Sequence, residues 1–286
     1  MNVLIQAHGL GDTICCTPAL KKLAITHNTK LKLFSNHPEV FTNLSYIISS
    51  NLIEKIKGEL AKNIQYVLYS NHVCGEMKHN LVDIRQFASL QCGFQLFPNE
   101  LHCEYIPSES FNINVPNKYI LIHAPNSWPV KTWDVNKWQE LCNAINLPIV
   151  SVGKDCKTDN EWQYTCNKLK SVLDLTNKTN LDQLWHLCNN AEYVITTDSS
   201  ILHLAGTTDT KIIYIAMGRD PQLTTPYRNG SQDYKLKIIS NNCSWCTSNL
   251  QILNNKFEGS LINCQQEKTN ETCQPSVDQV LEVING

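Results

Sequence analysis

Two segments in the second half of the chain carry side chains that suit the binding of a phosphate. They are the loop around Lys131 and the stretch Thr197-Asp198-Ser199-Ser200-Ile201-Leu202-His203. Each follows an apolar run that predicts a strand. A lysine in a loop at the carboxyl edge of a sheet is a natural phosphate ligand. The N–H groups at the start of a helix also attract anions. Together the two segments predict a phosphate-binding site.

Each of these residues also has a simpler interpretation. An isolated Lys131 beside Trp133 is more often a solvated lysine next to a core tryptophan. His203 lies one turn into its helix, on the face of Ser199 and Ser200, yet a lone helical histidine usually belongs to the core or the surface. Asp198 would be repelled by a phosphate if it pointed into the site. We therefore expect Asp198 to cap the helix or to bind hydroxyl groups of a ligand.

The first half of the chain holds one candidate acid–base residue, Asp12, in the stretch Gly9-Leu10-Gly11-Asp12-Thr13. Glycines there allow a tight turn and a close approach of the backbone to a ligand. A carboxylate at a helix N-terminus is stabilised by the helix dipole. An equally good interpretation is that Asp12 only caps the helix. The glycine spacing is not that of a dinucleotide-binding fingerprint.

Thirteen cysteines occur, and four of them near the C-terminus have spacing that can bind a metal. These four are Cys243, Cys246, Cys264 and Cys273, in the pattern C-x2-C-x17-C-x8-C. Four thiolates can form a tetrahedral site for iron or zinc. Disulfides are the alternative, but an odd cysteine total without a secretion signal favours the metal. The polar loop 243–273 would need either a bound metal ion or disulfide bonds to hold one conformation.

The order of apolar runs predicts an α/β protein with parallel sheets and two domains. The stretch 107–117, with two prolines, is expected to link a domain at 1–112 to a second at 118–286 that ends in a helix. Expected strands are 3–6, 31–34, 65–69, 102–106, 119–123, 148–152, 193–196 and 211–216. Expected helices are 52–60, 81–90, 135–144, 159–169, 181–189, 201–206 and 276–284, with a further helix near Thr17. Ligands of such sheets bind at the carboxyl ends of strands.

Composition and charge exclude some classes of function. The 286 residues are 42% hydrophobic and 17% charged, with a net charge of -2. Such a charge offers no basic field for nucleic acid, so a nucleic-acid partner is not expected. No apolar run is long enough for a membrane span, and the first residues do not resemble a signal peptide. We therefore expect a cytoplasmic protein.

Read together, the motifs resemble the heptosyltransferase-like glycosyltransferases, the family of the lipopolysaccharide heptosyltransferases. The resemblance spans most of the chain. It rests on the order and spacing of Gly9 to Thr13 with Thr17-Pro18-Ala19-Leu20, Lys131-Thr132-Trp133, Leu173 to Leu181, and Thr197 to Ala205. The family implies a GT-B fold, in which two Rossmann-like domains face each other. It also implies inverting transfer without a catalytic divalent cation, and this chain contains no Asp-x-Asp, the paired carboxylates that commonly hold such a cation.

Site residues follow from the resemblance, position by position. Asp12 would be the general base, Lys131 would contact the donor phosphates, and Thr176 would lie near the nucleotide. Asp198, Ser199, Ser200 and His203 would line the diphosphate and the sugar. The sequence departs from the family pattern at two positions, because Ser200 replaces a glycine and Ile201 a proline.

The resemblance also implies the ligands and partners. The donor would be a nucleotide-sugar, with heptose as the sugar and ADP-heptose as the donor. The acceptor would be a hydroxyl group on a glycan or a protein. The cysteine segment resembles that of bacterial autotransporter heptosyltransferases, where such cysteines hold an iron. Further copies of the chain in a homo-oligomer are an expected partner.

Two other functions stay open at this point. The chain could be a nucleotide-sugar-binding protein without catalytic activity, which the Ser200 and Ile201 departures favour weakly. It could also be a nucleic-acid glycosyltransferase of the kind that phages encode, which the net charge disfavours.

Overall fold

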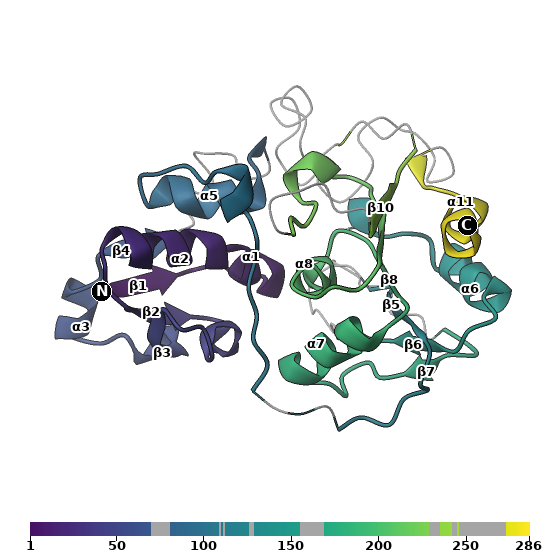
Figure 1. Cartoon of the computed structure of the whole chain (residues 1–286), viewed down its shortest axis with the longest axis horizontal. Helices are drawn as coiled ribbons and strands as arrows, with labels where there is room; N and C mark the ends of the chain where they lie inside the picture. Colours follow the sequence, from purple (N-terminus) through teal and green to yellow (C-terminus); the bar gives the residue numbers. More distant parts are fainter. Residues whose placement is uncertain are drawn as a thin grey trace. The chain divides into compact units, whose positions relative to one another are not determined.

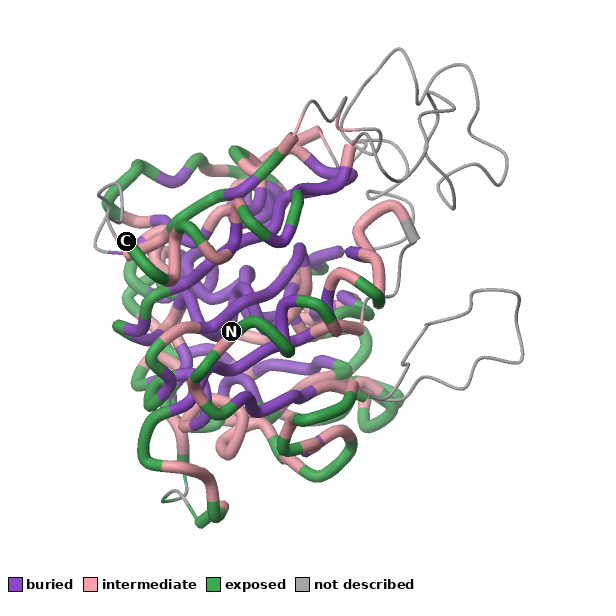
Figure 2. The backbone as a smooth tube through the Cα atoms, turned by 90° about the vertical axis from the view of Figure 1, so that its right-hand side faces the viewer, coloured by how far each residue is buried: buried purple, intermediate pink, exposed green. Residues whose placement is uncertain are grey.

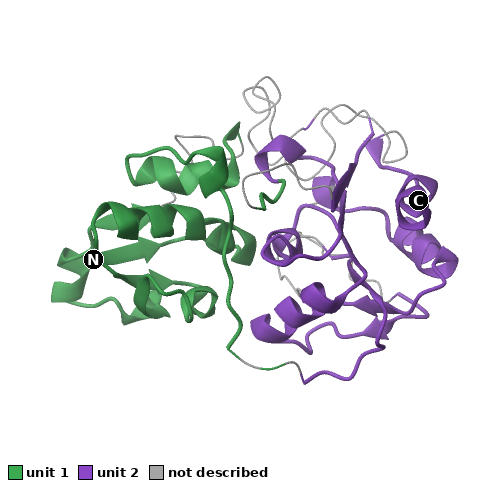
Figure 3. Ribbon diagram, viewed as in Figure 1, with its two compact units in different colours: residues 1–110, 225–233 green, residues 111–224, 234–286 purple. Residues whose placement is uncertain are grey.

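The computed structural model describes residues 1–69, 81–108, 110, 112–125, 129–154, 169–228, 235–241, 245 and 273–286. The chain divides into two compact units, which Figure 3 colours separately. Unit 1 comprises Met1–Ser110 and Thr225–Asp233, and unit 2 comprises Phe111–Thr224 and Tyr234–Gly286. The linker expected from the sequence, 107–117, can be compared with the boundary between Ser110 and Phe111. The return of the chain to unit 1 after residue 224 is not among the sequence-based expectations.

Unit 1 is built on a parallel sheet of four strands in the order β3-β2-β1-β4 (Figure 1). The strands are β1 (Asn2–Ile5), β2 (Leu31–Ser35), β3 (Ile47–Leu52) and β4 (Tyr66–Leu68). The α-helices are α1 (Leu10–Cys15), α2 (Thr17–Thr26), α3 (Glu59–Lys62) and α5 (Ile84–Gln91), and short 3-10 turns are η1 (Pro38–Phe41), η2 (Ile53–Lys55) and η4 (Pro98–Glu100). Helix α2 packs against α5, β1 buries alternate residues, and β2 is buried at every residue except Lys32. Buried residues are purple in Figure 2.

The first helical region breaks where the sequence indicated. Pro18 occupies one of the first two positions of α2, where its missing N–H costs nothing. The chain therefore forms α1, turns at Cys16 and begins again at Thr17. The expectation of a helix start near Thr17 is confirmed.

The expected strand at 102–106 is wrong, although its pattern has a physical basis. Residues 101, 103 and 105 are buried in alternation, as in a strand. The segment pairs with no strand among the described residues of unit 1. Instead, the Glu104 N–H donates to the hydroxyl of Thr17, at 2.9 Å. The segment is thus an extended chain that packs on a helix without joining the sheet.

The expected helix at 52–60 is also wrong. Residues Ile47–Leu52 form β3, which pairs in parallel with β2 at the edge of the sheet. Only single turns follow, at η2 and α3. The apolar spacing of this stretch fits a helix, but its first residue, Leu52, pairs with β2 and the rest forms only these turns.

Unit 2 is built on a parallel sheet of six strands in the order β10-β9-β8-β5-β6-β7. The strands are β5 (Ile120–His123), β6 (Ile149–Ser151), β7 (Leu173–Asp174), β8 (Tyr193–Thr196), β9 (Ile212–Ile215) and β10 (Leu236–Ile239). The α-helices are α6 (Val135–Ala144), α7 (Leu181–Asn190), α8 (Ser200–Ala205) and α11 (Val277–Asn285), and 3-10 turns are η5 (Pro129–Lys131) and η6 (Pro221–Leu223). Residues 155–168 lie outside the described part, so the helix expected at 159–169 stays a prediction.

Two tryptophans anchor the core of unit 2 on the face that α6 and α11 cover. Trp133 and Trp138 meet edge to face, with ring centroids 5.0 Å apart. Both are buried against Ile122, Ile195 and other strand residues, and α6 packs against α11. Such aromatic pairs are worth about 0.5–1.5 kcal/mol beyond their area burial. The loop that precedes α6 is therefore held firmly.

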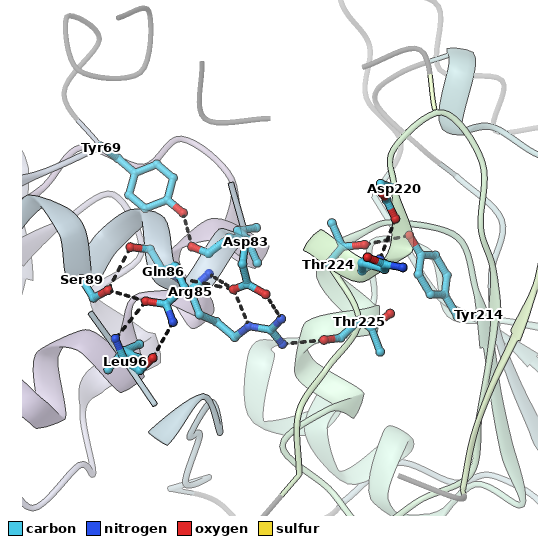
Figure 4. A network of polar contacts seen from close by, with 12 residues as sticks. Tyr69, Asp83, Arg85, Gln86, Ser89, Leu96, Tyr214, Asp220, Thr224 and Thr225 are labelled. Carbon is cyan, nitrogen blue, oxygen red and sulfur yellow. Dashed lines mark hydrogen bonds and ion pairs between the residues drawn. The ribbon is translucent and has the colours of Figure 1, made fainter. Parts of the chain in front are cut away.

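The return of the chain to unit 1 is fixed by a buried arginine, shown in Figure 4. Asp83 caps α5 and forms an ion pair with Arg85, whose side chain is fully buried. Arg85 Nη1 donates to the carbonyl oxygen of Thr225. The guanidinium also lies 5.5 Å from the ring centroid of Tyr227.

Among the described residues, no helix is long and apolar enough to cross a membrane.

Candidate functional site

The carboxyl edge of the unit 2 sheet brings together the two segments that the sequence singled out. Strand β5 pairs with β8, and His123 lies opposite Thr196 at the end of both strands. Lys131 belongs to η5, in the loop after β5. Asp198 belongs to the short connection between β8 and α8. Neighbouring parallel strands therefore deliver both side chains to the same edge, as expected for ligand sites of such sheets.

Lys131, Asp198 and His203 form a buried charged cluster. Lys131 Nζ lies 2.6 Å from Asp198 Oδ2, and His203 Nε2 lies 3.8 Å from Asp198 Oδ1. The exposed fractions of these side chains are only 14%, 5% and 4%. Lys131 is thus no solvated surface lysine, and Asp198 and His203 come together with it as one cluster.

The Asp198 carboxylate is held ionised by its neighbours. Burial alone would raise its pKa, but the charges of Lys131, Arg219 and His203 and the Lys131 hydrogen bond outweigh burial and lower the pKa to about 2. A charged Asp198 in turn fixes the position of the ammonium group of Lys131. The cluster therefore presents positively charged groups that are oriented before any ligand arrives.

Arg219 is a member of this cluster that the sequence reasoning missed. It is 4% exposed, and its positive charge acts on Asp198. It follows Gly218, whose φ is +71°, a conformation that favours glycine. A Cβ on Gly218 would lie 2.7 Å from the carbonyl oxygen of Val130. The glycine thus lets the loop after β9 touch the loop that carries Lys131. A Gly-Arg pair after a predicted strand was the available signal.

The start of α8 offers less attraction for an anion than the sequence suggested. Ser199 is its N-cap residue, yet its side chain does not cap the helix, because its hydroxyl lies 2.9 Å from that of Thr196. Ser200 and Ser199 are half-buried, and Ile201 is buried in the core. A helix of six residues has a small dipole. We therefore assign anion attraction at this edge mainly to the cationic side chains.

Thr176 lies apart from the charged cluster. It follows β7, where its N–H donates to Asp174 Oδ1 at 2.9 Å. Strand β7 is the edge strand of the sheet, three positions from β8. At about 4.8 Å per strand, the ends of β7 and β8 are on the order of 14 Å apart. Thr176 therefore shares the carboxyl edge with the cluster but does not contact it.

The loop with Lys131 is tied to the C-terminal part of the chain. Trp133 Nε1 donates to the carbonyl oxygen of Pro275 at 2.9 Å. The buried Gln274 side chain accepts from the Asp134 N–H at 2.9 Å and donates to the Thr132 carbonyl at 3.2 Å. These bonds bracket the residues just after Lys131. Gln274 therefore sets the path of the loop from which Lys131 reaches Asp198.

His123 at the end of β5 is kept neutral by its surroundings. Burial lowers its pKa to about 4, so the imidazole is uncharged at neutral pH. A Cβ on Gly153 would lie 3.6 Å from His123 Cδ2 and closer still to Pro125, so the loop after β6 packs tightly here. His123 adds a polar group to this edge but no positive charge.

Asp12 lies in unit 1, at the carboxyl end of β1. Gly9 is the N-cap residue of α1, so Asp12 occupies the first turn and does not itself cap the helix. The side chain of Asp12 is half-buried and therefore accessible to solvent. His8 and Gly9 next to it are exposed. An accessible carboxylate at a sheet edge can accept a proton from a ligand.

The four-cysteine segment falls mostly outside the described residues. Cys243, Cys246 and Cys264 are not described, and Cys273 is half-buried, four residues before α11 begins. Within the described ranges, no group of three or more metal-binding side chains occurs. The metal site therefore stays a prediction from spacing.

Comparison with known proteins shows which class this fold and site define. Residues 78–256 match the model of glycosyltransferase family 9 (heptosyltransferase). Because the match covers more than half of the chain, the chain belongs to this family. The two parallel sheets confirm the expected α/β fold, and the GT-B class is confirmed by the solved heptosyltransferases that resemble it.

Individual relatives agree with this family. The lipopolysaccharide core heptosyltransferase OpsX of Haemophilus influenzae is 27% identical over 122 residues, which cover 41% of this chain and 35% of OpsX. The match thus spans about a third of that relative's length. The iron-containing dodecameric glycosyltransferase TibC of Escherichia coli is 15% identical, with a TM-score of 0.71 over 99% of this chain and 76% of TibC. Heptosyltransferase II of E. coli has 13% identity and a TM-score of 0.61 over 100% of this chain and 98% of that chain.

Proposed function

We propose that this protein transfers a heptose from ADP-heptose to an acceptor hydroxyl group, with inversion and without a catalytic metal ion. The observation that carries the proposal is the buried cluster of Lys131, Asp198, His203 and Arg219 at the carboxyl edge of unit 2. Oriented cations in a buried setting suit a diphosphate leaving group. The sugar and the nucleotide come from the relatives, since a TibC structure contains ADP-D-beta-D-heptose.

The proposed reaction is a single displacement. Asp12 accepts the proton of the acceptor hydroxyl, and the hydroxyl oxygen forms a bond to the anomeric carbon. The bond from that carbon to the diphosphate oxygen breaks, and ADP leaves with the electron pair. The ammonium of Lys131 and the guanidinium of Arg219 neutralise the charge that grows on the leaving diphosphate. Asp198 holds Lys131 in place, and His203 can bind a phosphate or sugar oxygen.

Thr176 and the serines have supporting parts in this proposal. We propose that Thr176, about three strands away along the same edge, contacts the nucleoside end of the donor. The hydroxyls of Ser199 and Ser200 can bind oxygen atoms of the sugar. The absence of an Asp-x-Asp motif in the sequence supports transfer without a catalytic divalent cation.

We also propose that Cys243, Cys246, Cys264 and Cys273 hold one structural iron or zinc ion. Their spacing suits a thiolate site, and TibC, which this chain resembles in fold, is described as iron-containing. Since TibC is also dodecameric, we propose that this chain forms a homo-oligomer. As the acceptor we propose a hydroxyl group of a glycan or a protein, by analogy with the family.

A transfer assay with purified protein tests the proposal. We expect release of ADP from ADP-heptose when a heptose-containing glycan or a hydroxyl-bearing peptide is supplied, and no dependence of the rate on EDTA added during the assay. Asp12→Asn should lower kcat by about 100-fold or more, because general-base catalysis contributes roughly 10²–10⁴-fold. ADP affinity should stay within about twofold, since Asp12 lies in the other unit from the cluster.

Two results would contradict these assignments. Near-normal transfer by folded Asp12→Asn protein would exclude Asp12 as the base. Tight binding of ADP-heptose by the wild-type protein, without transfer to any acceptor, would favour a binding protein that lacks catalysis.

A further inference from the structure

The backbone conformation at position 9 does not require a glycine. Its φ of -85° and ψ of 138° are extended values that any residue adopts. The sequence had suggested a tight turn or a close approach of a ligand as the reason for a glycine here. Gly9 is also exposed, so no buried neighbour excludes a larger side chain. The reason must lie in what occupies the space around it.

That space is occupied by the carboxylate of Asp12. A Cβ built on Gly9 would lie 2.9 Å from Asp12 Oδ2 and 3.7 Å from Asp12 Cγ. Ordinary contacts of a Cβ begin at 3.4 Å, so the carboxylate oxygen would have to move by about half an ångström. Within the described residues, Asp12 is the side chain that such a Cβ meets.

Hydrogen bonds hold the main chain at Gly9 and at Asp12. A Cβ at position 9 would therefore displace the side chain of Asp12 and not the backbone. The carbonyl oxygen of Gly9 accepts from the Thr13 N–H at 3.1 Å and from the Thr13 hydroxyl at 3.0 Å. The Asp12 carbonyl accepts from Cys16 Sγ at 3.4 Å. Thr13 is fully buried. The end of an aspartate side chain rotates at low cost, whereas this anchored turn does not.

We propose that Gly9 is a positioning residue for Asp12: the missing Cβ leaves the room in which the carboxylate stands at the angle needed for proton transfer. This inference rests on the proposed function of Asp12 as the base. A methyl group at position 9 would displace the carboxylate and leave the fold and the donor site of unit 2 intact. A shift of about 1 Å can cost 100-fold in rate, so a shift of half that size is costly as well.

The test is the variant Gly9→Ala, measured for kcat, melting temperature and ADP affinity. We expect kcat to fall by about 10-fold or more. The melting temperature should stay the same or rise slightly, because alanine restricts the unfolded chain and fits this backbone conformation. The dissociation constant for ADP should stay within about twofold. A loss of activity without a loss of stability is a pattern that a merely structural role of Gly9 would not produce.

Gly58→Ala is the matched control, because the same methyl group should there have the opposite effects. Gly58 is also exposed and in unit 1, has a φ of +55°, and has open space around its Cβ position. Alanine at this φ is strained, so Gly58→Ala should lower the melting temperature and leave kcat unchanged.

A double-mutant comparison shows whether Gly9 acts through Asp12. In the Asp12→Ala protein no carboxylate remains to be displaced, so the residual rate should change by less than about twofold when Gly9→Ala is added. Unchanged kcat in Gly9→Ala alone, a large drop of its melting temperature, or a further fall in the Asp12→Ala background would overturn the inference. Unchanged kcat in Asp12→Asn would instead overturn the proposed base, so the two failures are distinguishable.

Discussion

Lys131, Asp198, His203 and Arg219 interact as a set of charges. Asp198 is buried, which disfavours its ionised form, and yet its pKa is lowered to about 2 by Lys131, Arg219 and His203. One carboxylate thus pairs with Lys131, lies near His203 and feels the charge of Arg219. Such an arrangement binds an anion well because its dipoles and charges need little rearrangement when the ligand enters.

Arg219 and Lys131 should each be needed for binding of the β-phosphate. We expect Arg219→Gln and Lys131→Met to weaken ADP binding by about 10- to 100-fold, because a hydrogen bond to a charged group contributes roughly 1.5–3 kcal/mol. The affinity of the same variants for AMP, which lacks the second phosphate, should fall by less. Isothermal titration calorimetry with both nucleotides measures the difference.

The exposed Lys211 offers a matched control in unit 2. Lys211→Met removes the same charge far from the described cluster and should leave both affinities unchanged. Equal losses for AMP and ADP in Arg219→Gln would show that Arg219 does not act on the diphosphate. Arg219→Lys should keep part of the affinity, since the charge remains while the planar fork is lost.

At the scale of elements, two loops and one terminal segment build the site. Gly218 allows the loop after β9 to touch Val130, and residues 274 and 275 hold the loop that follows Lys131. The strands themselves only bring these loops to one edge. Local packing between loops that are far apart in sequence then decides where the cations point.

Gln274 provides a test of this loop packing. We expect Gln274→Ala to weaken ADP binding by about 10-fold although Gln274 itself touches no proposed ligand, because its side chain holds the backbone at Thr132 and Asp134. The protein should also lose about 1–3 kcal/mol of stability, the usual cost of leaving buried polar groups unpaired. Calorimetry and denaturant unfolding measure the two effects.

Asn143→Ala serves as the comparison, since Asn143 is an exposed amide on the neighbouring helix α6. It should change neither quantity. If Gln274→Ala lost stability but bound ADP normally, Gln274 would support the fold of unit 2 without positioning Lys131.

For the whole molecule, the two units have separate parallel sheets and separate roles in the proposal. Unit 2 carries the donor cluster and unit 1 the proposed base. Each unit is nevertheless built from more than one stretch of the chain. Arg85 and His102 bind the backbone of Thr225 and Tyr227, so unit 1 is completed by residues that lie more than 120 positions later.

The proposed metal site can be tested on the whole protein. We expect elemental analysis to find about one iron or zinc ion per chain, as for a four-thiolate site. Cys273→Ser should lower the metal content and the melting temperature, because binding of a structural metal contributes to folding. Cys92→Ala, which changes a buried cysteine of unit 1 outside the set, should keep the metal.

A metal content near zero in protein purified without chelators would exclude this site. Full metal content in Cys273→Ser would show that Cys273 is not one of its ligands.

Several features followed from the sequence alone because their causes are local. The apolar runs at β2, β5 and β8 are buried almost throughout and β1 buries alternate residues, so their composition and spacing reveal them. Pro18 determined where α2 begins, and the order of the motifs indicated the family. The edge strand β3 was not predicted, because its pairing with β2 decides it. The stretch at 102–106 was wrongly predicted as a strand, because its burial alternates although it pairs with no strand among the described residues.

The prediction of a phosphate site from Lys131 and the stretch 197–203 rests on residue types and on their positions after strands, and the sequence indicates both. Only the tertiary structure decided the contacts within it. Arg219 joins the cluster through a contact between Gly218 and Val130, and Gln274 reaches Thr132 across more than 140 positions. The short distance between a Cβ at position 9 and the carboxylate of Asp12, on which the proposed role of Gly9 rests, is likewise visible only in the structure. Such contacts depend on distances in space, which the spacing of residues along the chain does not specify.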